Sequence, residues 1–454
     1  MAMPSRHWIV ELYQTQRKRQ DASHVEFFER AAMHHRISRR HALCCGAAAL
    51  GGLFTSLIDA RTPDEARVPG QNWPSRVADL VAQVFEGLDP AQLCDVHTHL
   101  LGTGDSGSGC WVNPQLDSWR HPMEVMRKRV ILQGAGVDAR SRRIDDDYVQ
   151  RLLDLTQDFP AGARWLLLAF EHAHDDGGRV APQSTTFHVP DAWALQQARR
   201  HAAAFSWIAS VHPYRDDAPQ RLRQAIAQGA VAVKWLPSAM NIDLRDPRCR
   251  PVYDLLAGTR TPLLIHGGEE KAVPGAGRDD LGNPLLARVP LAHGVRVIVA
   301  HCASLGTARD LDARRPGDVS AFSLFARLMS EPEWNDRLCG DVSAVWQVNR
   351  SPEVWRTVIE RDSWHPRLMH GSDYPLPCVP LLLRTPPLVR AGVLSTADAA
   401  DLERVRELNP LLFDFALKRR LRWRGHRLSD ELFAAGRHFR TAGDTPPAAG
   451  GRHA

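Results

Sequence analysis

CDVHTH, at residues 94–99, is a short segment in which two histidines are separated by a single residue. Side chains two positions apart on a β-strand point to the same side, so His97 and His99 can converge on one ion. A helix would not allow this at that spacing. Neutral imidazole is a good ligand for zinc and its neighbours, so the pair marks a candidate metal site at the end of a strand.

Three further short apolar runs also end in residues that bind metals. TPLLIH ends at His266, VRVIVAH ends at His301, and RLMHGSD ends at Asp373. Continuous apolar runs of this length are typical of strands that are buried on both faces. A metal site at the rim of a parallel barrel takes its ligands from the ends of several strands, and the order HxH, His, His, Asp fits that arrangement.

Alternation of such runs with amphipathic helical segments predicts a parallel sheet, because parallel strands need crossover connections. We expect a (β/α)₈ TIM barrel with an N-terminal extension and C-terminal closing helices. The expected strands are residues 92–98, 164–170, 206–211, 230–235, 262–266, 296–301, 338–343 and 367–372.

Seven segments together resemble a known family. They are DVHTHL at 95–100, VAVKWLP at 231–237, PLLIHGG at 262–268, VIVAHCASLG at 297–306, GDVSA at 340–344, HGSDYPLP at 370–377 and ELNPLLFDF at 407–415. The chain resembles the amidohydrolase superfamily, in its amidohydrolase-related branch of metal-dependent TIM-barrel hydrolases. The resemblance covers residues 90–418. It is specific for the fold and says little about the substrate.

The resemblance implies roles for the strand-end residues. Those matching His97, His99 and His266 bind the metal, usually Zn²⁺, although Mn²⁺, Fe²⁺ and Co²⁺ suit the same ligands. Asp373 would contact both the metal and the attacking water. His301 would either bind a second metal or assist catalysis. Asp341 resembles a structural acid of the family.

Lys234 ends the apolar run VAVKW, and a charge inside a barrel is costly unless it is paired. In some superfamily members a lysine at this place is carboxylated and bridges two metals. In other branches it contacts substrate or supports the structure. Whether the site holds one metal or two depends on this residue.

Five residues on loops or at strand ends are weaker candidates for substrate contacts. The loop after the first strand is rich in Gly and Ser and would overlie the metal. The candidates are Trp111, Asn113, His172, Trp346 and Arg350.

Composition sets limits on the other possibilities. The 454 residues carry a net charge of +5, with 44% hydrophobic and 24% charged residues, which is ordinary for a globular protein. No basic, aromatic-studded module stands out, so nucleic-acid binding is not expected. The eight cysteines include no CxxC pair, so no disulfide framework is expected.

The chain divides into four segments. Residues 1–60 form an N-terminal extension, and 61–90 form a linker with an approach helix at 75–85. Residues 91–418 form the barrel, and 419–454 form a basic tail that we expect to be disordered.

The N-terminal extension contains SRRHAL at 38–43, followed by an Ala- and Gly-rich apolar run. Twin Arg before an apolar segment resembles a signal for the twin-arginine export machinery, which would place the enzyme in the periplasm. The other interpretation is a buried or oligomer-facing helix of a cytoplasmic enzyme. A homodimer is the default assembly.

Two enzyme hypotheses follow. In the first, a metal-activated water attacks a C–N, ester or lactone carbonyl of a small molecule, with Asp373 as proton shuttle. In the second, the same barrel is a non-oxidative decarboxylase of an aromatic or unsaturated carboxylic acid. One metal and an unmodified Lys234 favour decarboxylation, whereas two bridged metals favour hydrolysis. A metal-free binding protein is a third hypothesis, which the intact set of site residues disfavours.

Overall fold

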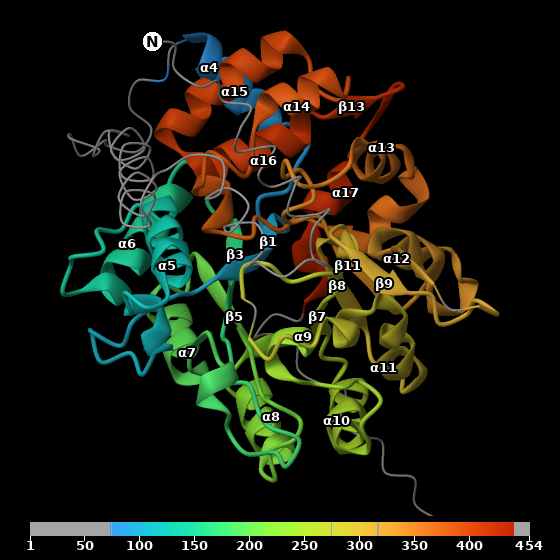
Figure 1. Ribbon diagram of the computed structural model, residues 1–454. Coiled ribbons are helices and arrows are strands. Elements are labelled where there is room, and N and C mark those ends of the chain that lie inside the picture. Colours follow the sequence, from blue (N-terminus) through green and yellow to red (C-terminus); the bar gives the residue numbers. More distant parts are fainter. Residues whose placement is uncertain (1–72, 74, 274, 316, 440–454) are drawn as a thin grey trace, which may run out of the picture. The chain divides into compact units, whose positions relative to one another are not determined.

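Eight parallel strands form the central sheet of the protein, in the order β1-β3-β5-β6-β7-β8-β11-β12. The computed structural model describes residues 73, 75–273, 275–315 and 317–439. Chain order equals spatial order, as in a (β/α)₈ barrel, and the predicted fold class is confirmed (Figure 1). The strands are β1 Cys94–His99, β3 Arg164–Leu168, β5 Phe205–Ala209, β6 Ala230–Trp235, β7 Leu263–His266, β8 Val297–Ala300, β11 Leu338–Asp341 and β12 Leu368–Met369.

The barrel closes through the segment that follows β12. The Val96 amide donates to the His370 carbonyl at 3.0 Å, and the His99 amide donates to the Tyr374 carbonyl at 3.0 Å. In the other direction, the Asp373 amide donates to the His97 carbonyl at 2.8 Å. The first strand is thereby joined to the residues after the last one.

Helices surround the strands (Figure 1). Helix α13 shows why they form: Ser351 caps it by accepting from the Val354 amide, and its apolar side chains lie on one buried face. The crossover helices are α5 Pro122–Gly134, α6 Ile144–Thr156, α7 Asp191–Arg200, α8 Ala218–Ala227, α9 Pro237–Met240, α10 Arg250–Thr259, α11 Arg288–Ala292, α12 Ala321–Ser330 and α13 Pro352–Glu360. Helix α4, Ser75–Phe85, precedes the barrel with the bounds expected of the approach helix.

Among the described residues, three pairs of very short antiparallel strands lie outside the barrel sheet. They are β2 Trp111–Val112 with β4 Phe187–His188, β9 Thr307–Arg309 with β10 Asp318–Ser320, and β13 Arg422–Trp423 with β14 His426–Arg427. The first pair matters for the site, because it joins the loop after β1 to the loop after β3.

The chain after β12 contains helices beyond the closing helices that the sequence predicts. It forms α14 Thr385–Arg390, α15 Thr396–Leu408, α16 Pro410–Arg420 and α17 Asp430–Phe433. The expectation that the tail is disordered from residue 419 is wrong for residues 419–439. The physical reason is that Phe433 and Phe439 are buried, and Phe439 packs in one apolar cluster with barrel residues such as Val96 and Met369.

Parts of both chain ends are not described by the structure. The twin-arginine segment and the rest of residues 1–60 lie outside the described residues, as do residues 440–454. None of the described helices is long and apolar enough to span a bilayer.

Candidate functional site

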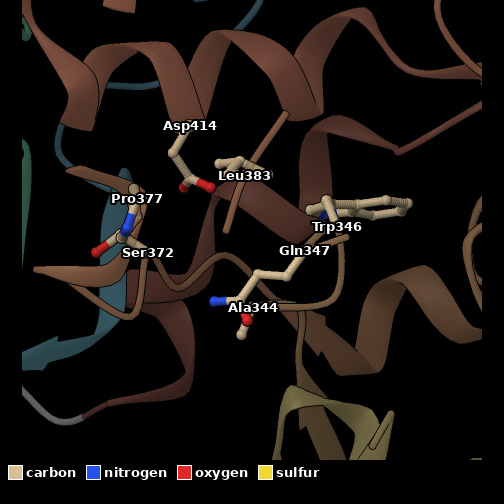
Figure 2. A pocket seen from close by; sticks show the side chains of 7 residues that line it. All are labelled: Ala344, Trp346, Gln347, Ser372, Pro377, Leu383 and Asp414. Carbon is tan, nitrogen blue, oxygen red and sulfur yellow. The ribbon is translucent and has the colours of Figure 1, made fainter. Parts of the chain in front are cut away.

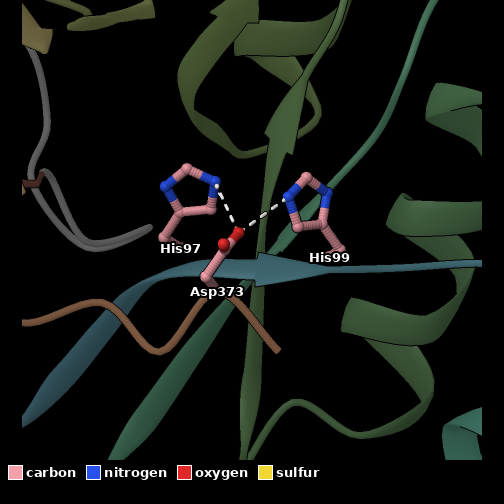
Figure 3. A group of neighbouring side chains, drawn as sticks. All are labelled: His97, His99 and Asp373. Atoms are coloured by element: carbon pink, nitrogen blue, oxygen red, sulfur yellow. Dashed lines mark ion pairs between the residues drawn. The ribbon is translucent and has the colours of Figure 1, made fainter. Parts of the chain in front are cut away.

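His97, His99 and Asp373 come together where β1 ends and the closing segment passes it (Figure 3). The His99 Nε2 lies 3.1 Å from the Asp373 Oδ1, and the His97 Nε2 lies 3.6 Å from the same oxygen. One ligand atom from each residue lies within 4.8 Å of the others, so the three could hold one metal ion. The backbone bonds that close the barrel bring Asp373 to the two histidines.

The pairing of β1 with β3 shifts register between Asp95 and Thr98. Such a bulge re-aims the side chains beside it and is common next to functional sites. It occurs here at His97, which projects towards Asp373.

His97 is oriented by groups on β11 and on the turn after it. Its Nδ1 lies 2.9 Å from the Asp341 Oδ2 and 3.2 Å from the Ser343 Oγ. A carboxylate at Nδ1 keeps the proton there and leaves the Nε2 lone pair for a metal. That Nε2 is buried and has no hydrogen-bond partner within the described part of the chain. A buried, unpaired nitrogen that faces a carboxylate fits a metal ligand.

His301 lies beside His97, with ring centroids 4.8 Å apart. Its Nδ1 lies 2.8 Å from the Ser343 Oγ, and its amide donates to the Asp341 Oδ1 at 3.0 Å. Residues His301, Cys302 and Ala303 all have positive φ, as does Asp373 at 62°. Backbone of this kind is strained for residues other than glycine and concentrates at functional sites.

His266, at the end of β7, does not join the three-residue group. Its Nδ1 lies 3.2 Å from the Glu270 Oε2, and its Nε2 lies 3.4 Å from the Glu269 carbonyl oxygen. Its ring centroid is 5.1 Å from that of His301, so it stands at the edge of the same site. Glu270 orients its imidazole as expected for a residue that supports a ligand.

Lys234 is fully buried at the end of β6, and its Nζ has no hydrogen-bond partner among the residues described. Burial lowers the pKa of its ammonium to about 8, although Asp341, Asp373 and Glu270 oppose the shift. A buried amine of this kind is readily deprotonated or paired with an incoming anion.

Burial sets the proton affinities of the other site residues. It lowers the pKa of His97, His266 and His301 below the usual range, with the Lys234 charge contributing to each shift. The three imidazoles are therefore neutral at pH 7 and have lone pairs to offer. Burial raises the pKa of the Asp373 carboxyl, and His99 opposes that shift.

The candidate substrate residues on the first loops make contacts with one another's loops. The Asn113 amide donates to the carbonyls of Pro182 and Thr185, and its Oδ1 accepts from the Gln115 amide, so it braces the loop. Trp111 packs against His172, with ring centroids 5.6 Å apart.

Trp346 is buried and lines a small cavity beside the site, between the loops after β11 and β12 and helix α16 (Figure 2). Asp414 of α16 and Ser372, the neighbour of Asp373, line the same cavity. Arg350 is also buried and donates to the Ser304 hydroxyl and to the Gln347 and Asn349 side chains.

Ser343 is a site residue that the sequence analysis missed. Its hydroxyl contacts His97, His301 and Asp341 together. The spacing Asp341-x-Ser343 at the end of a strand is the signal that could have revealed it, since residues two apart share one side of a strand.

With the geometry described, comparison with known proteins decides the family. A family model described as amidohydrolase matches residues 94–413. The chain belongs to the amidohydrolase family. No curated protein sequence matches it significantly.

Several solved structures are similar to this chain. A TIM-barrel protein from Bordetella bronchiseptica is 13% identical with a TM-score of 0.41, and the match covers 64% of this chain and 87% of that one. A 5-carboxyvanillate decarboxylase from Sphingomonas paucimobilis is 12% identical with a TM-score of 0.38, covering 70% and 96%. A 4-oxalomesaconate hydratase from Rhodopseudomonas palustris is 16% identical with a TM-score of 0.34, covering 62% and 81%.

Proposed function

We propose that this amidohydrolase is a metal-dependent hydrolase of a C–N, ester or lactone bond in a small molecule. The observation that carries the proposal is the meeting of the His97 and His99 Nε2 atoms at the Asp373 carboxylate, 3.6 and 3.1 Å away. Two imidazoles and one carboxylate are the ligand types of a hydrolytic zinc site.

His97, His99 and Asp373 would hold the ion, and His266 would complete the set at its edge. A divalent ion bound there supplies a water of lowered pKa and polarises the carbonyl that is attacked. Mn²⁺, Fe²⁺ and Co²⁺ would suit the same residues.

Asp373 is the residue proposed to move the proton. Burial raises the pKa of its carboxyl, which makes it a better proton acceptor than an exposed aspartate. Its Oδ1 faces His99, and its Oδ2 is the atom proposed to take the proton and return it to the departing nitrogen or oxygen. The positive φ and the backbone bond to the His97 carbonyl hold this side chain in place.

His301 is proposed to assist as a neutral group that accepts a hydrogen bond from the attacking water. Its Nδ1 lies 3.1 Å from the Ser343 carbonyl oxygen, which keeps the proton on Nδ1 and leaves the Nε2 lone pair for that role. The Ser343 hydroxyl orients the ring, and Asp341 holds the backbone by accepting from the His301 amide.

Decarboxylation of an aromatic or unsaturated acid is the second candidate, and Lys234 is the observation that favours it. An unpaired ammonium buried beside the site would attract a substrate carboxylate. A carboxylated Lys234 that bridges two ions would instead favour hydrolysis.

The first experiment compares wild type with Asp373→Asn on a library of amides, lactones, esters and carboxylic acids, with Asp336→Asn as a control. Asp336 carries an exposed carboxylate that pairs with Arg337 and takes no part in these contacts. We expect hydrolysis by wild type and a loss of at least about 100-fold in kcat for Asp373→Asn. Release of CO₂ from an acid without any hydrolysis would replace the first candidate with the second. Unchanged turnover in Asp373→Asn would contradict both mechanisms.

Lys234→Met separates the two roles of the lysine. If Lys234 meets the carboxylate of the substrate, KM rises while the number of bound ions stays the same. If Lys234 bridges two ions, the variant binds about one ion fewer.

A further inference from the structure

We propose that Glu171, His172 and His188 form a second metal site, separate from the one at His97, His99 and Asp373. It would take a first-row transition ion such as Zn²⁺ or Co²⁺. One ligand atom from each of these three residues lies within 4.8 Å of the other two, and the group shares no member with the first one.

The backbone brings the three residues together. Glu171 and His172 follow β3 by a few residues, and His188 lies on β4 in the loop that comes next. Phe170 and Val189 form an antiparallel bridge, with their amides and carbonyls bonded at 2.9 and 2.8 Å. Glu171 and His188 are the next residues of that bridge, so they face one another.

The loop after β1 holds the cluster from another side. Trp111 on β2 is the direct partner of His188 on β4, and the Trp111 ring packs against His172. Two connections of the barrel therefore hold the backbone of the proposed ligands in place, and only a side-chain rotation is needed to bind an ion.

Two ligand nitrogens of the cluster are unused. The Nδ1 atoms of His172 and His188 are both buried and make no hydrogen bond to any residue that the structure describes. Leaving a polar atom buried without a partner costs free energy, and an ion shared by both nitrogens would remove that cost. Nothing in the hydrolytic mechanism uses these two atoms.

Glu171 supplies the negative charge. Its side chain is 8% exposed, and its Oε1 lies 3.7 Å from the His188 Nδ1 while accepting from the His172 amide at 3.0 Å. The Arg215 Nη1 forms an ion pair with the Oε2 at 3.7 Å, while the Nε and Nη2 of the same guanidinium donate to Asp217 at 2.8 and 3.1 Å, which offsets its charge. The Oε1, which is the oxygen nearer to His188, is the atom proposed to face the ion.

The two imidazoles are stacked, with centroids 4.0 Å apart and 15° between their planes. The lone pairs lie in the ring planes, so one ring must turn out of the stack to share an ion with the other. His188, whose side chain is 17% exposed, is the ring proposed to turn. Two nitrogens and one oxygen suit transition ions rather than Mg²⁺ or Ca²⁺, and three protein ligands leave a position for water or an external group.

The test counts ions at each site separately. Chelator-treated full-length protein is titrated with ZnCl₂ by calorimetry and with CoCl₂ by visible absorption, using wild type, His188→Phe and Glu171→Gln. His121→Phe is the matched control, because His121 is exposed and lies outside both groups. We expect His188→Phe to bind about one ion fewer than wild type and to lose part of the Co²⁺ absorption. The control should match wild type.

A fourth variant, His97→Ala, separates this proposal from the proposed function. If both sites exist, His97→Ala keeps the ion that His188→Phe loses. Equal ion counts and affinities in wild type, His188→Phe and Glu171→Gln would overturn the second site while leaving the first untouched.

Wild-type crystals soaked in ZnCl₂ give a measurement that does not depend on how the variants fold. Anomalous density between Glu171 and His188 is the expected result. Density at His97 and His99 with none at Glu171 would overturn the proposal.

Discussion

Asp341 is the residue on which the geometry of the proposed hydrolytic site depends most. It is fully buried at the end of β11 and pairs its Oδ2 with the His97 Nδ1, while its Oδ1 accepts from the amides of His301 and Ser343. Both carboxylate oxygens of Asp341 are therefore engaged in contacts that orient neighbouring groups. The carboxylate therefore sets which nitrogen of His97 carries the proton.

Asp341→Asn should weaken metal binding by about 10- to 100-fold. The amide oxygen must stay towards the two backbone donors, so the amide NH₂ faces the His97 Nδ1 and moves the imidazole proton to Nε2. Competition titration with a Zn²⁺ indicator measures the affinity. Asp336→Asn is the control, and an unchanged Zn²⁺ affinity in Asp341→Asn would show that this pairing does not matter.

Asp191 predicts a pH dependence of stability. It accepts from the Ser210 amide at 2.8 Å, and burial raises the pKa of its carboxyl to about 7. Because the folded state holds the proton more tightly than the unfolded state, the contribution of this group to stability is full below about pH 4 and is lost as the pH rises through about 7.

Asp191→Asn keeps an acceptor for Ser210 and removes the titration. We expect the urea stability of wild type to fall relative to the variant between pH 4 and pH 7, by on the order of 2–4 kcal/mol. Parallel stability curves for the two proteins across that range would contradict the prediction.

The ends of the strands explain which site residues could be predicted. His97, His99, His301 and Asp373 stand where apolar runs stop, and a parallel barrel brings such ends to one rim. The same reasoning misses His188, because β4 is two residues long and has no periodicity to recognise. The sequence analysis includes His172 among its candidates, but it does not predict the stacked partner, His188.

At the scale of elements, the barrel strands were predictable and the small pairs were not. Strands buried on both faces read as continuous apolar runs, and β6 has the predicted bounds, Ala230–Trp235. The β2 and β4 pair depends on contacts between two loops, which no local pattern encodes. The sequence predicts a strand up to residue 372, but the ladder ends at Met369, and single backbone hydrogen bonds continue the closure beyond it.

The closing segment has little room for side chains. A Cβ added at Gly371 would lie 2.8 Å from the His97 Cβ and 3.2 Å from the Ser343 Cβ. Gly371→Ala should therefore push β1 and the β11 turn apart, costing about 1–3 kcal/mol of stability and weakening Zn²⁺ binding.

Urea denaturation and Zn²⁺ titration measure both effects. Gly258→Ala is the matched control, because a Cβ there meets nothing within 4 Å and the residue lies in helix α10. The control should be as stable as wild type or more so, by up to about 1 kcal/mol. If the two variants had the same urea stability and the same Zn²⁺ affinity, the close approach at Gly371 would not constrain the fold.

At the scale of the whole molecule, the carboxyl ends of the strands and the segment after residue 420 contribute differently to the barrel. Residues at the carboxyl ends of the strands form the proposed metal site, while Ala435 and Phe439 join the apolar cluster of the barrel interior. Phe433 packs against Phe415 and His370, and the His370 amide donates to the Leu432 carbonyl at 2.9 Å. The segment after residue 420 thus packs against the barrel and stabilises it.

A chain that ends at residue 420 should lose this support. The removed residues include the buried Leu428, Leu432, Phe433 and Phe439, and each large side chain contributes about 1.5–3 kcal/mol. Their sum approaches the whole stability of a typical domain, so we expect insoluble or unfolded protein. Soluble yield and thermal melting are the measurements. A chain that ends at residue 439 keeps every one of these contacts and is the control, and equal melting temperatures would contradict the prediction.

The closure of the barrel also bears on how the protein matures during synthesis. His97 and His99 lie in the first strand, and Asp373 follows the last one, so more than half of the chain separates them. Joining such distant segments carries a large loop entropy and comes late in folding. A ribosome must release almost the entire barrel before these ligands can meet. We therefore expect that an ion held by His97, His99 and Asp373 would be captured only after the chain beyond residue 373 has emerged, so that its uptake would report closure of the barrel.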